Sequence, residues 1–245
     1  MNNAELPTTA GAPRWKIIVT VVVAVAGAAI IGGVFLSRFN AQYAAARRNV
    51  AMNRLRMIAM GIHNYEIADG QRGPPAAIYG RDGKPLLSWR VAVLPFLDEK
   101  ALYDQFHLDE PWDSPHNAAL INKMPDIFQP PSGEYQDNGK TSFVVPVAQK
   151  VAASGTEGRS SPEINRWGQK RVLIVEAARD GAVEWTKPAD LLVDENDPWA
   201  GLRDTRGRGL VVAFTDGSTD EIPASTPNNT LNALLLIPGA RPAGR

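Results

Sequence analysis

A run of 21 residues without a charged side chain, from Ile17 to Ser37, constrains this chain more than any other feature. As a helix, with a rise of about 1.5 Å per residue, such a run spans roughly 30 Å, the thickness of the hydrocarbon core of a bilayer. A backbone crosses that core only when its hydrogen bonds are satisfied within the segment, as they are in a helix. The apolar region of a cleaved signal peptide is usually shorter, about 7–15 residues. The sequence therefore predicts a retained transmembrane helix over residues 17–37.

The helical pattern continues past this run. Between residues 38 and 68, apolar side chains recur mostly at three- and four-residue steps, the spacing of one helix face. The apolar positions are Phe39, Tyr43, Ala46, Val50, Leu55, Ile58, Ile62 and Tyr65, and the arginines assigned to the opposite face are Arg47, Arg48, Arg54 and Arg56. No proline occurs before Pro74, and Asp69-Gly70 is a signal for the end of a helix. We expect one continuous helix in which residues 38–68 form an amphipathic stalk packed on a soluble domain.

Charge is distributed unevenly along a chain whose formal net charge is zero. Residues 38–68 carry five arginines and one glutamate, a net charge of +4, whereas residues 69–245 carry 19 basic and 24 acidic side chains, a net charge of −5. An acidic globular part argues against nucleic acid as a partner. The first stalk arginines lie where they can meet anionic lipid head groups. A chain without cysteine is compatible with either redox compartment.

These features divide the chain into five expected segments. They are a cytoplasmic tail over 1–16, the transmembrane helix over 17–37, the stalk over 38–68, a soluble head over 69–238 and a flexible tail over 239–245. One long helix followed by several strand patterns and short helix patterns indicates the α+β class, with the helix packed on an antiparallel sheet.

Within the head, turn and cap residues set the expected element boundaries. We expect helices over 99–106 after the cap Asp98, over 115–122 after Ser114-Pro115, and over 228–236 after Thr226-Pro227. The expected extended segments are 86–97 after the Asp82-Gly83 turn, 143–147 at a sheet edge because of Pro146, 171–177 at the sheet centre, and the hairpin 210–222 with Asp216-Gly217 at its turn. Residues 153–163 and most of 185–204 are expected to be loops.

Two clusters of potential metal ligands occur in the head. His107, Asp109, Asp113 and His116 bring imidazoles and carboxylates within ten positions, which suits zinc or another transition metal, although the same residues fit turns and helix caps. Asp194, Asn196, Asp197 and Asp204 offer the hard oxygens that calcium prefers, without the spacing of an EF-hand. The turn and cap interpretation is preferred, so we expect no bound metal and no cofactor.

The sequence gives little support to catalysis. It contains none of the common nucleophile, zinc-protease or phosphate-loop motifs. Glu176 and Asp180 could form the carboxylate pair of a glycosidase, but such pairs are more often solvated or capping. Five tryptophans could line a carbohydrate or peptide groove, although roles in the core are the more common use of this residue: Trp89, Trp112, Trp167, Trp185 and Trp199. We expect no catalytic residues and no enzymatic activity.

Several blocks of the head resemble a known bacterial family. The blocks are His63-Asn64-Tyr65, Pro74-Pro75-Ala76, Asp82 to Arg90 (DGKPLLSWR), Leu94 to Leu97 (LPFL), Leu102 to Asn117, Trp185 to Leu191 (WTKPADL), and Val212-Ala213-Phe214 with Asp216-Gly217-Ser218. In order over residues 55–236, they are similar to the domain of unknown function 1559 family, which is abundant in planctomycete-type bacteria. The resemblance implies a fold like that of type IV pilins and type II secretion pseudopilins, with an exported α+β head and no established enzymatic activity.

The chain departs from that family pattern at two places. The apolar helix begins Trp15 to Thr20 (WKIIVT), without the glycine and glutamate of a prepilin-peptidase signature, so we expect the N-terminus to remain uncleaved. The family places a histidine ten residues before the Asp-Gly of its last motif, and here that position is Arg206. Any role of that imidazole is therefore not inherited.

Orientation in the membrane is the point on which charge and resemblance disagree. Five arginines follow the apolar run and only Arg14 and Lys16 flank it on the other side, which favours a cytoplasmic head. The resemblance implies an exported head, and large C-terminal domains translocate largely regardless of charge. We therefore expect a single-pass protein of the bacterial inner membrane with residues 38–245 outside the cytoplasm. Its expected function is that of a pseudopilin-like structural or interaction protein with itself or envelope proteins as partners, the alternative being an exported carbohydrate- or peptide-binding module.

Overall fold

The computed structural model describes residues 14–70, 73–131, 139–148, 170–202 and 209–235. The backbone forms two compact units, Met1–Ala46 and Arg47–Arg245. The expected tails at the two ends of the chain and the expected loop over 153–163 lie wholly or largely outside the described residues.

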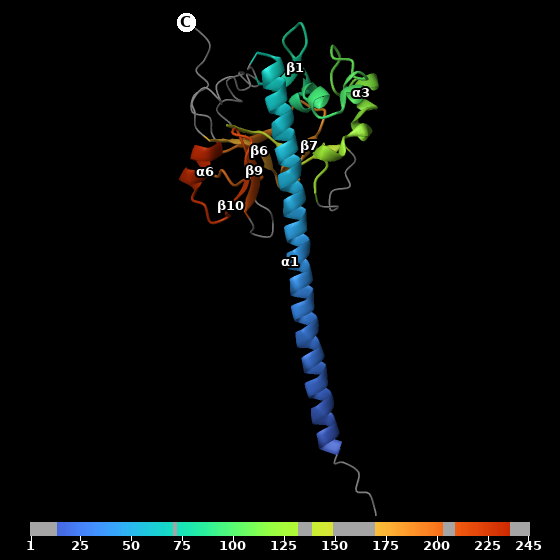
Figure 1. Ribbon diagram of the computed structural model, residues 1–245, viewed down its shortest axis with the longest axis vertical. Helices are drawn as coiled ribbons and strands as arrows, with labels where there is room; N and C mark the ends of the chain where they lie inside the picture. The colour runs from blue at the N-terminus through green and yellow to red at the C-terminus, as the bar shows by residue number, and fades with distance from the viewer. Residues whose placement is uncertain (1–13, 71–72, 132–138, 149–169, 203–208, 236–245) are drawn as a thin grey trace, which may run out of the picture. The chain divides into compact units, whose positions relative to one another are not determined.

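Helix α1, Arg14–Ala68, is the long helix that the sequence predicts (Figure 1). It ends at the expected place, where Gly70 takes a φ of 70°, a left-handed conformation that glycine adopts without a steric penalty. In the first unit its apolar side chains are exposed, as at Val23, Ile31 and Phe35. The most apolar 18-residue window of the helix has a mean hydropathy of 2.1, and none of it is buried. This combination is consistent with a membrane anchor or a signal sequence.

The second unit is built around a four-stranded antiparallel sheet. Its strands, in the order β10-β9-β6-β4, are Thr219–Ile222, Leu210–Phe214, Val172–Glu176 and Phe143–Val144. The predicted central strand is confirmed as β6, which pairs with β9 on one side and β4 on the other. The predicted hairpin is also confirmed, because β9 pairs with β10 across a turn in which Gly217 has a φ of 78°.

Three two-stranded pairs and several short helices complete this unit. The pairs are β1 (Ala77–Tyr79) with β2 (Pro85–Ser88), β3 (Lys140–Thr141) with β7 (Val183–Glu184), and β5 (Pro146–Ala148) with β8 (Leu191–Val193), of which only the last is parallel. The short helices are α2 (Trp89–Ala92), η1 (Leu94–Phe96), α3 (Lys100–Tyr103), α4 (Pro115–Ala118), η2 (Ile121–Lys123), η3 (Asp126–Phe128), η5 (Arg179–Gly181) and α6 (Asn228–Leu235).

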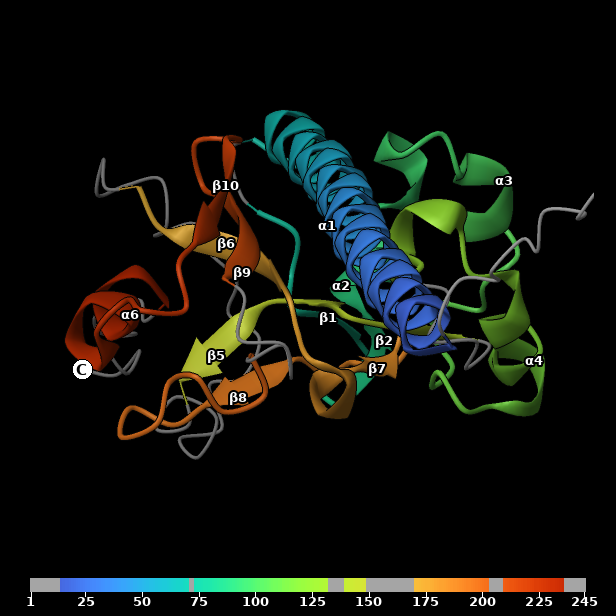
Figure 2. The same ribbon diagram turned by 90° about the horizontal axis from the view of Figure 1, so that it is seen from below.

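The core of the second unit lies on both faces of the sheet. On one face, Leu55 and Ile58 of α1 belong to the same buried cluster as Ile174 of β6. On the other face, Leu231 of α6 is buried in a cluster with Val175 of β6. Ile174 and Val175 are adjacent in sequence and point to opposite faces, as alternation along a strand requires. The result is an α+β, pilin-like arrangement in which the C-terminal part of α1 covers an antiparallel sheet, with α3 and α4 on the other side of the helix from β9 and β10 (Figures 1 and 2).

The predicted stalk stripe is correct only in its second half. Leu55, Ile58 and Ile62 are buried, and Tyr65 is half-buried. The first four predicted positions, Phe39, Tyr43, Ala46 and Val50, are exposed. The helix positions buried against the head are Ala51, Leu55, Ile58 and Ile62, which lie on one face of α1. The first four predicted positions lie on another face, so the prediction joined two separate faces of one helix.

Three local predictions also needed correction. The segment expected to be extended over 86–97 turns helical at Trp89, because the Ser88 hydroxyl accepts a hydrogen bond from the Arg90 backbone N–H and caps α2. Asp98 is not a cap but adopts a φ of 61°, and Glu99 precedes α3, which is shorter than expected. The cap Ser114 is confirmed, but α4 ends at Ala118. Most of the described part of 185–204 is irregular, as expected, with the short strand β8 within it.

Candidate functional site

Arg90 in α2 is a charged residue that is fully buried in the head. Its guanidinium donates from Nη2 to Oδ1 of Asp190, just before β8, at 2.7 Å. The side chain of Arg90 is 0% exposed and that of Asp190 is 10% exposed. Charged side chains are rarely buried so deeply unless they are paired, as these two are.

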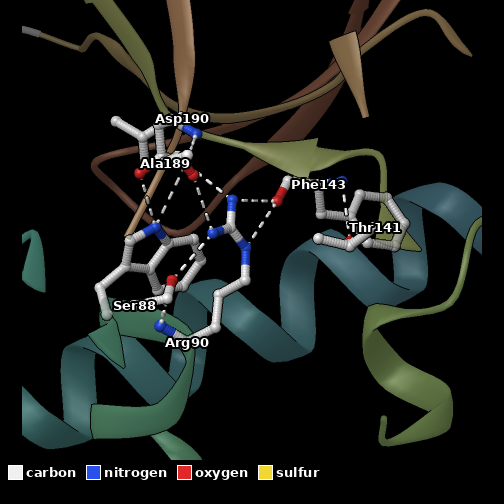
Figure 3. Close-up of polar contacts among 8 residues, drawn as sticks. Ser88, Arg90, Thr141, Phe143, Ala189 and Asp190 are labelled. Atoms are coloured by element: carbon white, nitrogen blue, oxygen red, sulfur yellow. Dashed lines mark hydrogen bonds and ion pairs between the residues drawn. The ribbon is translucent and has the colours of Figure 1, made fainter. Parts of the chain in front are cut away.

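The remaining hydrogen bonds of the pair bring three segments of the chain together, residues 88–90, 143–145 and 189–190 (Figure 3). Arg90 donates from Nε and Nη2 to the Phe143 carbonyl, at 3.1 and 2.9 Å. It donates from Nη1 to the Ser88 hydroxyl at 2.9 Å and to the Ala189 carbonyl at 3.3 Å. All five guanidinium N–H donors therefore have acceptors.

Asp190 is satisfied in the same way. Its Oδ1 accepts from the Val145 backbone N–H at 2.9 Å, and its Oδ2 accepts from Nε1 of Trp89 at 3.0 Å. Burial lowers the pKa of the Arg90 guanidinium and raises the pKa of the Asp190 carboxyl, and in each case the opposite charge of the partner acts against that shift. Every donor of the guanidinium and both oxygens of the carboxylate are therefore bonded within the fold, as a stable buried ion pair requires.

A cavity of about 370 Å³ lies in the second unit between α1 and the turn that joins β9 to β10. Its lining comprises Ala59, Met60, Ile62, His63, Asn64, Glu66, Leu173, Phe214, Thr215, Asp216 and Gly217. This volume falls at the lower end of the range of small-molecule pockets, roughly 300–1,000 Å³.

The ionisable side chains that line the cavity interact with neighbouring residues of the chain. Oδ1 of Asp216 accepts from the Ser218 hydroxyl at 2.6 Å and from the Ser218 N–H at 2.9 Å, and these bonds, with the charge of Lys170, lower the pKa of Asp216. Nδ1 of His63 lies 3.5 Å from Oε2 of Glu66. Two carboxylates and an imidazole at the cavity can accept hydrogen bonds from a small polar ligand.

The predicted His107 cluster forms a packed loop. The imidazole rings of His107 and His116 stack with centroids 3.5 Å apart and an interplanar angle of 1°. Nδ1 of His107 lies 2.9 Å from Oε1 of Glu110, and Nε2 of His116 lies 2.7 Å from the Gln105 carbonyl. Asp109 and Asp113 do not join them, and within the described parts of the chain no three His, Asp or Glu side chains are grouped to hold a metal ion.

The loop is organised by a residue that sequence reasoning missed. Asn117 is fully buried; its Nδ2 donates to the carbonyls of His107, Glu110 and Pro111, and its Oδ1 accepts from the His107 N–H. The available signal was a polar residue directly after His116 and three positions after the cap Ser114. Its partners are all backbone groups, which a sequence does not reveal.

The other predicted oxygen-rich loop is closed by local bonds. Oδ1 of Asp194 accepts from the backbone N–H and the side-chain amide of Asn196, at 2.9 and 3.0 Å. The Asp197 N–H donates to the Asp194 carbonyl at 3.1 Å, and Asp204 lies outside the described residues. The hypothetical carboxylate pair is divided between β6, where Glu176 is half-buried, and η5, where Asp180 is exposed.

The tryptophans do not line a groove in the described parts of the head. Trp89, Trp185 and Trp199 are at most 3% exposed. Their indole N–H groups donate to Asp190, to the Ile121 carbonyl and to the Thr226 carbonyl, so each is a satisfied core residue. Trp112 is half-buried with the Lys187 ammonium 5.2 Å from its ring centroid, and Trp167 lies outside the described residues.

Fold and site together define a class: an α+β head whose centre is a structural ion pair, covered by the end of a long helix that begins with an exposed apolar segment. The chain belongs to the family described as protein of unknown function DUF1559, which matches residues 42–192. The match includes Arg90, Asp190 and the blocks that carry the resemblance up to Leu191, while the hairpin block at 212–218 lies beyond it. No curated protein and no solved structure matches the chain.

Proposed function

We propose that this protein is a membrane-anchored, pseudopilin-like structural or interaction protein of the bacterial inner membrane, without catalytic activity. Residues 17–37 cross the bilayer once, and the head stands outside the cytoplasm.

One observation carries this proposal. The first part of α1 is apolar along its whole circumference, with Val23 65%, Ile31 72% and Phe35 69% exposed. Large apolar side chains exposed on every side of a helix are stable only when something apolar surrounds them, and a lipid bilayer does so without further protein. The length of the uncharged run fits the thickness of the bilayer core.

The chemistry of the head supports a role in structure and interaction. The buried Arg90 and Asp190 bond to each other and to the backbone, and the histidines of the 107–117 loop stack and bond locally. The alternative function, a carbohydrate- or peptide-binding module, was motivated by tryptophans, and Trp89, Trp185 and Trp199 lie in the core. Hydrolysis of a common glycan, peptide or ester by the purified protein at an enzyme-like rate would overturn the proposal.

Alkaline extraction of membranes tests the anchor. The full chain with a C-terminal tag should remain in the membrane pellet after carbonate washing, because an integral helix is held by the hydrophobic effect and not by ion pairs. A matched variant with Val23→Asp, Ile31→Asp and Phe35→Asp places charges in the segment and should appear in the soluble fraction. Release of the unaltered chain by carbonate would contradict a membrane-spanning anchor.

A further inference from the structure

The cavity between the end of α1 and the hairpin of β9 and β10 has an apolar floor and a polar rim (Figure 2). Its floor is formed by the least exposed lining residues, Ala59, Ile62 and Phe214, which are at most 6% exposed. At its rim, the side chains of His63 and Asp216 are 67% and 48% exposed. An apolar lining with a few polar groups is typical of small-molecule sites. A ligand that complements this cavity has an apolar part and a polar part.

The size of the cavity limits such a ligand to a small molecule. Its volume of about 370 Å³ is that of about twelve water molecules, at roughly 30 Å³ for each. A molecule with one ring and a short side chain fits within this space. A peptide or a glycan chain would extend beyond it.

The charges around the cavity favour a cation. Glu66 and Asp216 contribute two carboxylates, and none of the described residues that line the cavity is lysine or arginine. Lys170 lies outside the lining, with Nζ 3.6 Å from Oδ2 of Asp216, and both side chains of this pair are 48% exposed. An ion pair so exposed is weak and is screened by solvent. His63 adds a positive charge only when it is protonated. An anion would therefore be repelled by the carboxylates, whereas a cation would be attracted.

Asp216 is held in place by the turn in which it lies. Its Oδ1 accepts from the hydroxyl and the N–H of Ser218, and the Gly217 N–H donates to the Phe214 carbonyl at 2.9 Å. The bonds from Ser218 also lower the pKa of Asp216, so the carboxylate is ionised at neutral pH. Its Oδ2 has the longer contact with Lys170. A carboxylate that is already positioned can accept a charge-assisted hydrogen bond without losing further side-chain entropy.

We propose that this cavity binds a small organic cation, a primary amine whose ammonium group contacts Asp216 and whose apolar part lies on Ile62 and Phe214. Glu66 adds negative charge on the α1 side of the same cavity. This binding goes beyond the structural role proposed above and does not rest on the membrane anchor.

Nuclear magnetic resonance of labelled methionine methyl groups tests binding at this position. The full-length protein in detergent micelles is titrated with phenethylamine to about 10 mM, which covers the millimolar affinity typical of so small a ligand. The Met60 signal should shift and saturate, because Met60 lines the cavity. Met57, one turn earlier, is similarly exposed but outside the lining, so its signal should not move. Equal shifts of the two signals, or no saturable shift of Met60, would overturn the proposal.

Two further probes of matched size test the choice of a cation. Phenylethanol lacks the charge and should bind about three- to tenfold more weakly than phenethylamine, because it loses a charge-assisted hydrogen bond at a partly exposed site. Phenylacetate carries the opposite charge and should not bind detectably. Affinities of the alcohol or the acid equal to that of the amine would contradict recognition of the ammonium group.

Two Asp-Gly turns provide matched variants. Asp216 and Asp82 each pair with a lysine in such a turn, but only Asp216 lines the cavity. Asp216→Asn keeps an oxygen that can accept from Ser218 and should weaken amine binding about three- to tenfold, whereas Asp82→Asn should leave it unchanged. Glu66→Gln, on the α1 side, should also weaken it. Thermal unfolding of each ligand-free variant at the parent's temperature separates lost binding from lost folding. Unchanged affinity in both Asp216→Asn and Glu66→Gln would overturn the proposal.

Discussion

The ion pair of Arg90 and Asp190 joins parts of the chain a hundred residues apart. Arg90 follows β2 and Asp190 precedes β8. Arg90 donates to the carbonyl of Phe143, the first residue of β4, and Asp190 accepts from the N–H of Val145, which lies between β4 and β5. Two ions lose much hydration on burial, and their attraction compensates only when every remaining donor and acceptor is satisfied, as it is here. The pair therefore selects one arrangement of these segments over others.

Replacing Asp190 by asparagine should destabilise the head strongly. The variant leaves the Arg90 guanidinium buried without a counter-charge, which costs about 3–5 kcal/mol of unfolding free energy. Urea unfolding followed by tryptophan fluorescence measures this loss. Asp104→Asn, which removes only an exposed pair with Lys100, is the control and should change the unfolding free energy by less than about 1 kcal/mol. Similar stability of the two variants would show that the buried pair does not organise the head.

Both residues of the pair lie in stretches that stand out in the sequence, but the sequence does not show that they contact each other. Arg90 stands in an otherwise apolar stretch, and the Trp185 to Leu191 block was recognised as a motif. Nothing in local spacing links residues 90 and 190, because a tertiary contact leaves no period in the sequence. At His107 and His116 the residue types also suited a metal, and the preferred turn-and-cap interpretation could not reveal that the two rings stack in a loop organised by Asn117.

At the scale of elements, the predictions that succeeded rest on strong local signals. The hairpin of β9 and β10 follows from Asp216-Gly217, and the position of β6 follows from a strand without a polar face. The helix α2 was missed because four residues give too little periodicity, and the decisive signal was a serine cap. The prediction of the stalk stripe was wrong in its first half, because it joined exposed apolar residues on one face of α1 to buried residues on another. Only the tertiary structure separates the two faces.

Gly61 tests how closely α1 approaches the head. A Cβ at this position would meet Cδ2 of Leu97, so a larger residue here must displace the Leu97 side chain in the segment after η1. Gly61→Val should therefore destabilise the head by about 1–3 kcal/mol, as overpacking usually does. Arg56→Val introduces the same branched side chain at an exposed position of the same helix and should have a small effect on the thermal unfolding temperature. Equal effects would contradict the close packing.

At the scale of the whole molecule, the arginines of the stalk bear on orientation. Nη1 of Arg48 lies 2.6 Å from Oε2 of Glu221 in β10, and Nη1 of Arg54 donates to the Gln129 carbonyl at 2.6 Å. Arginines bonded to an acidic head are partly neutralised and folded into it, so they act less as cytoplasmic anchors than free arginines beside a membrane would. The bonds of Arg48 and Arg54 to the head are compatible with the proposed exported head.

The most direct test of the proposed orientation is a pair of reporters fused after Arg245. Alkaline phosphatase folds only outside the cytoplasm of a bacterial cell, where its disulfides form, and a cytosol-only fluorescent protein matures only inside. An exported head predicts an active phosphatase and a dark fluorescent fusion, both retained in the membrane fraction. A fluorescent fusion with an inactive phosphatase would place the head in the cytoplasm and overturn the proposed orientation.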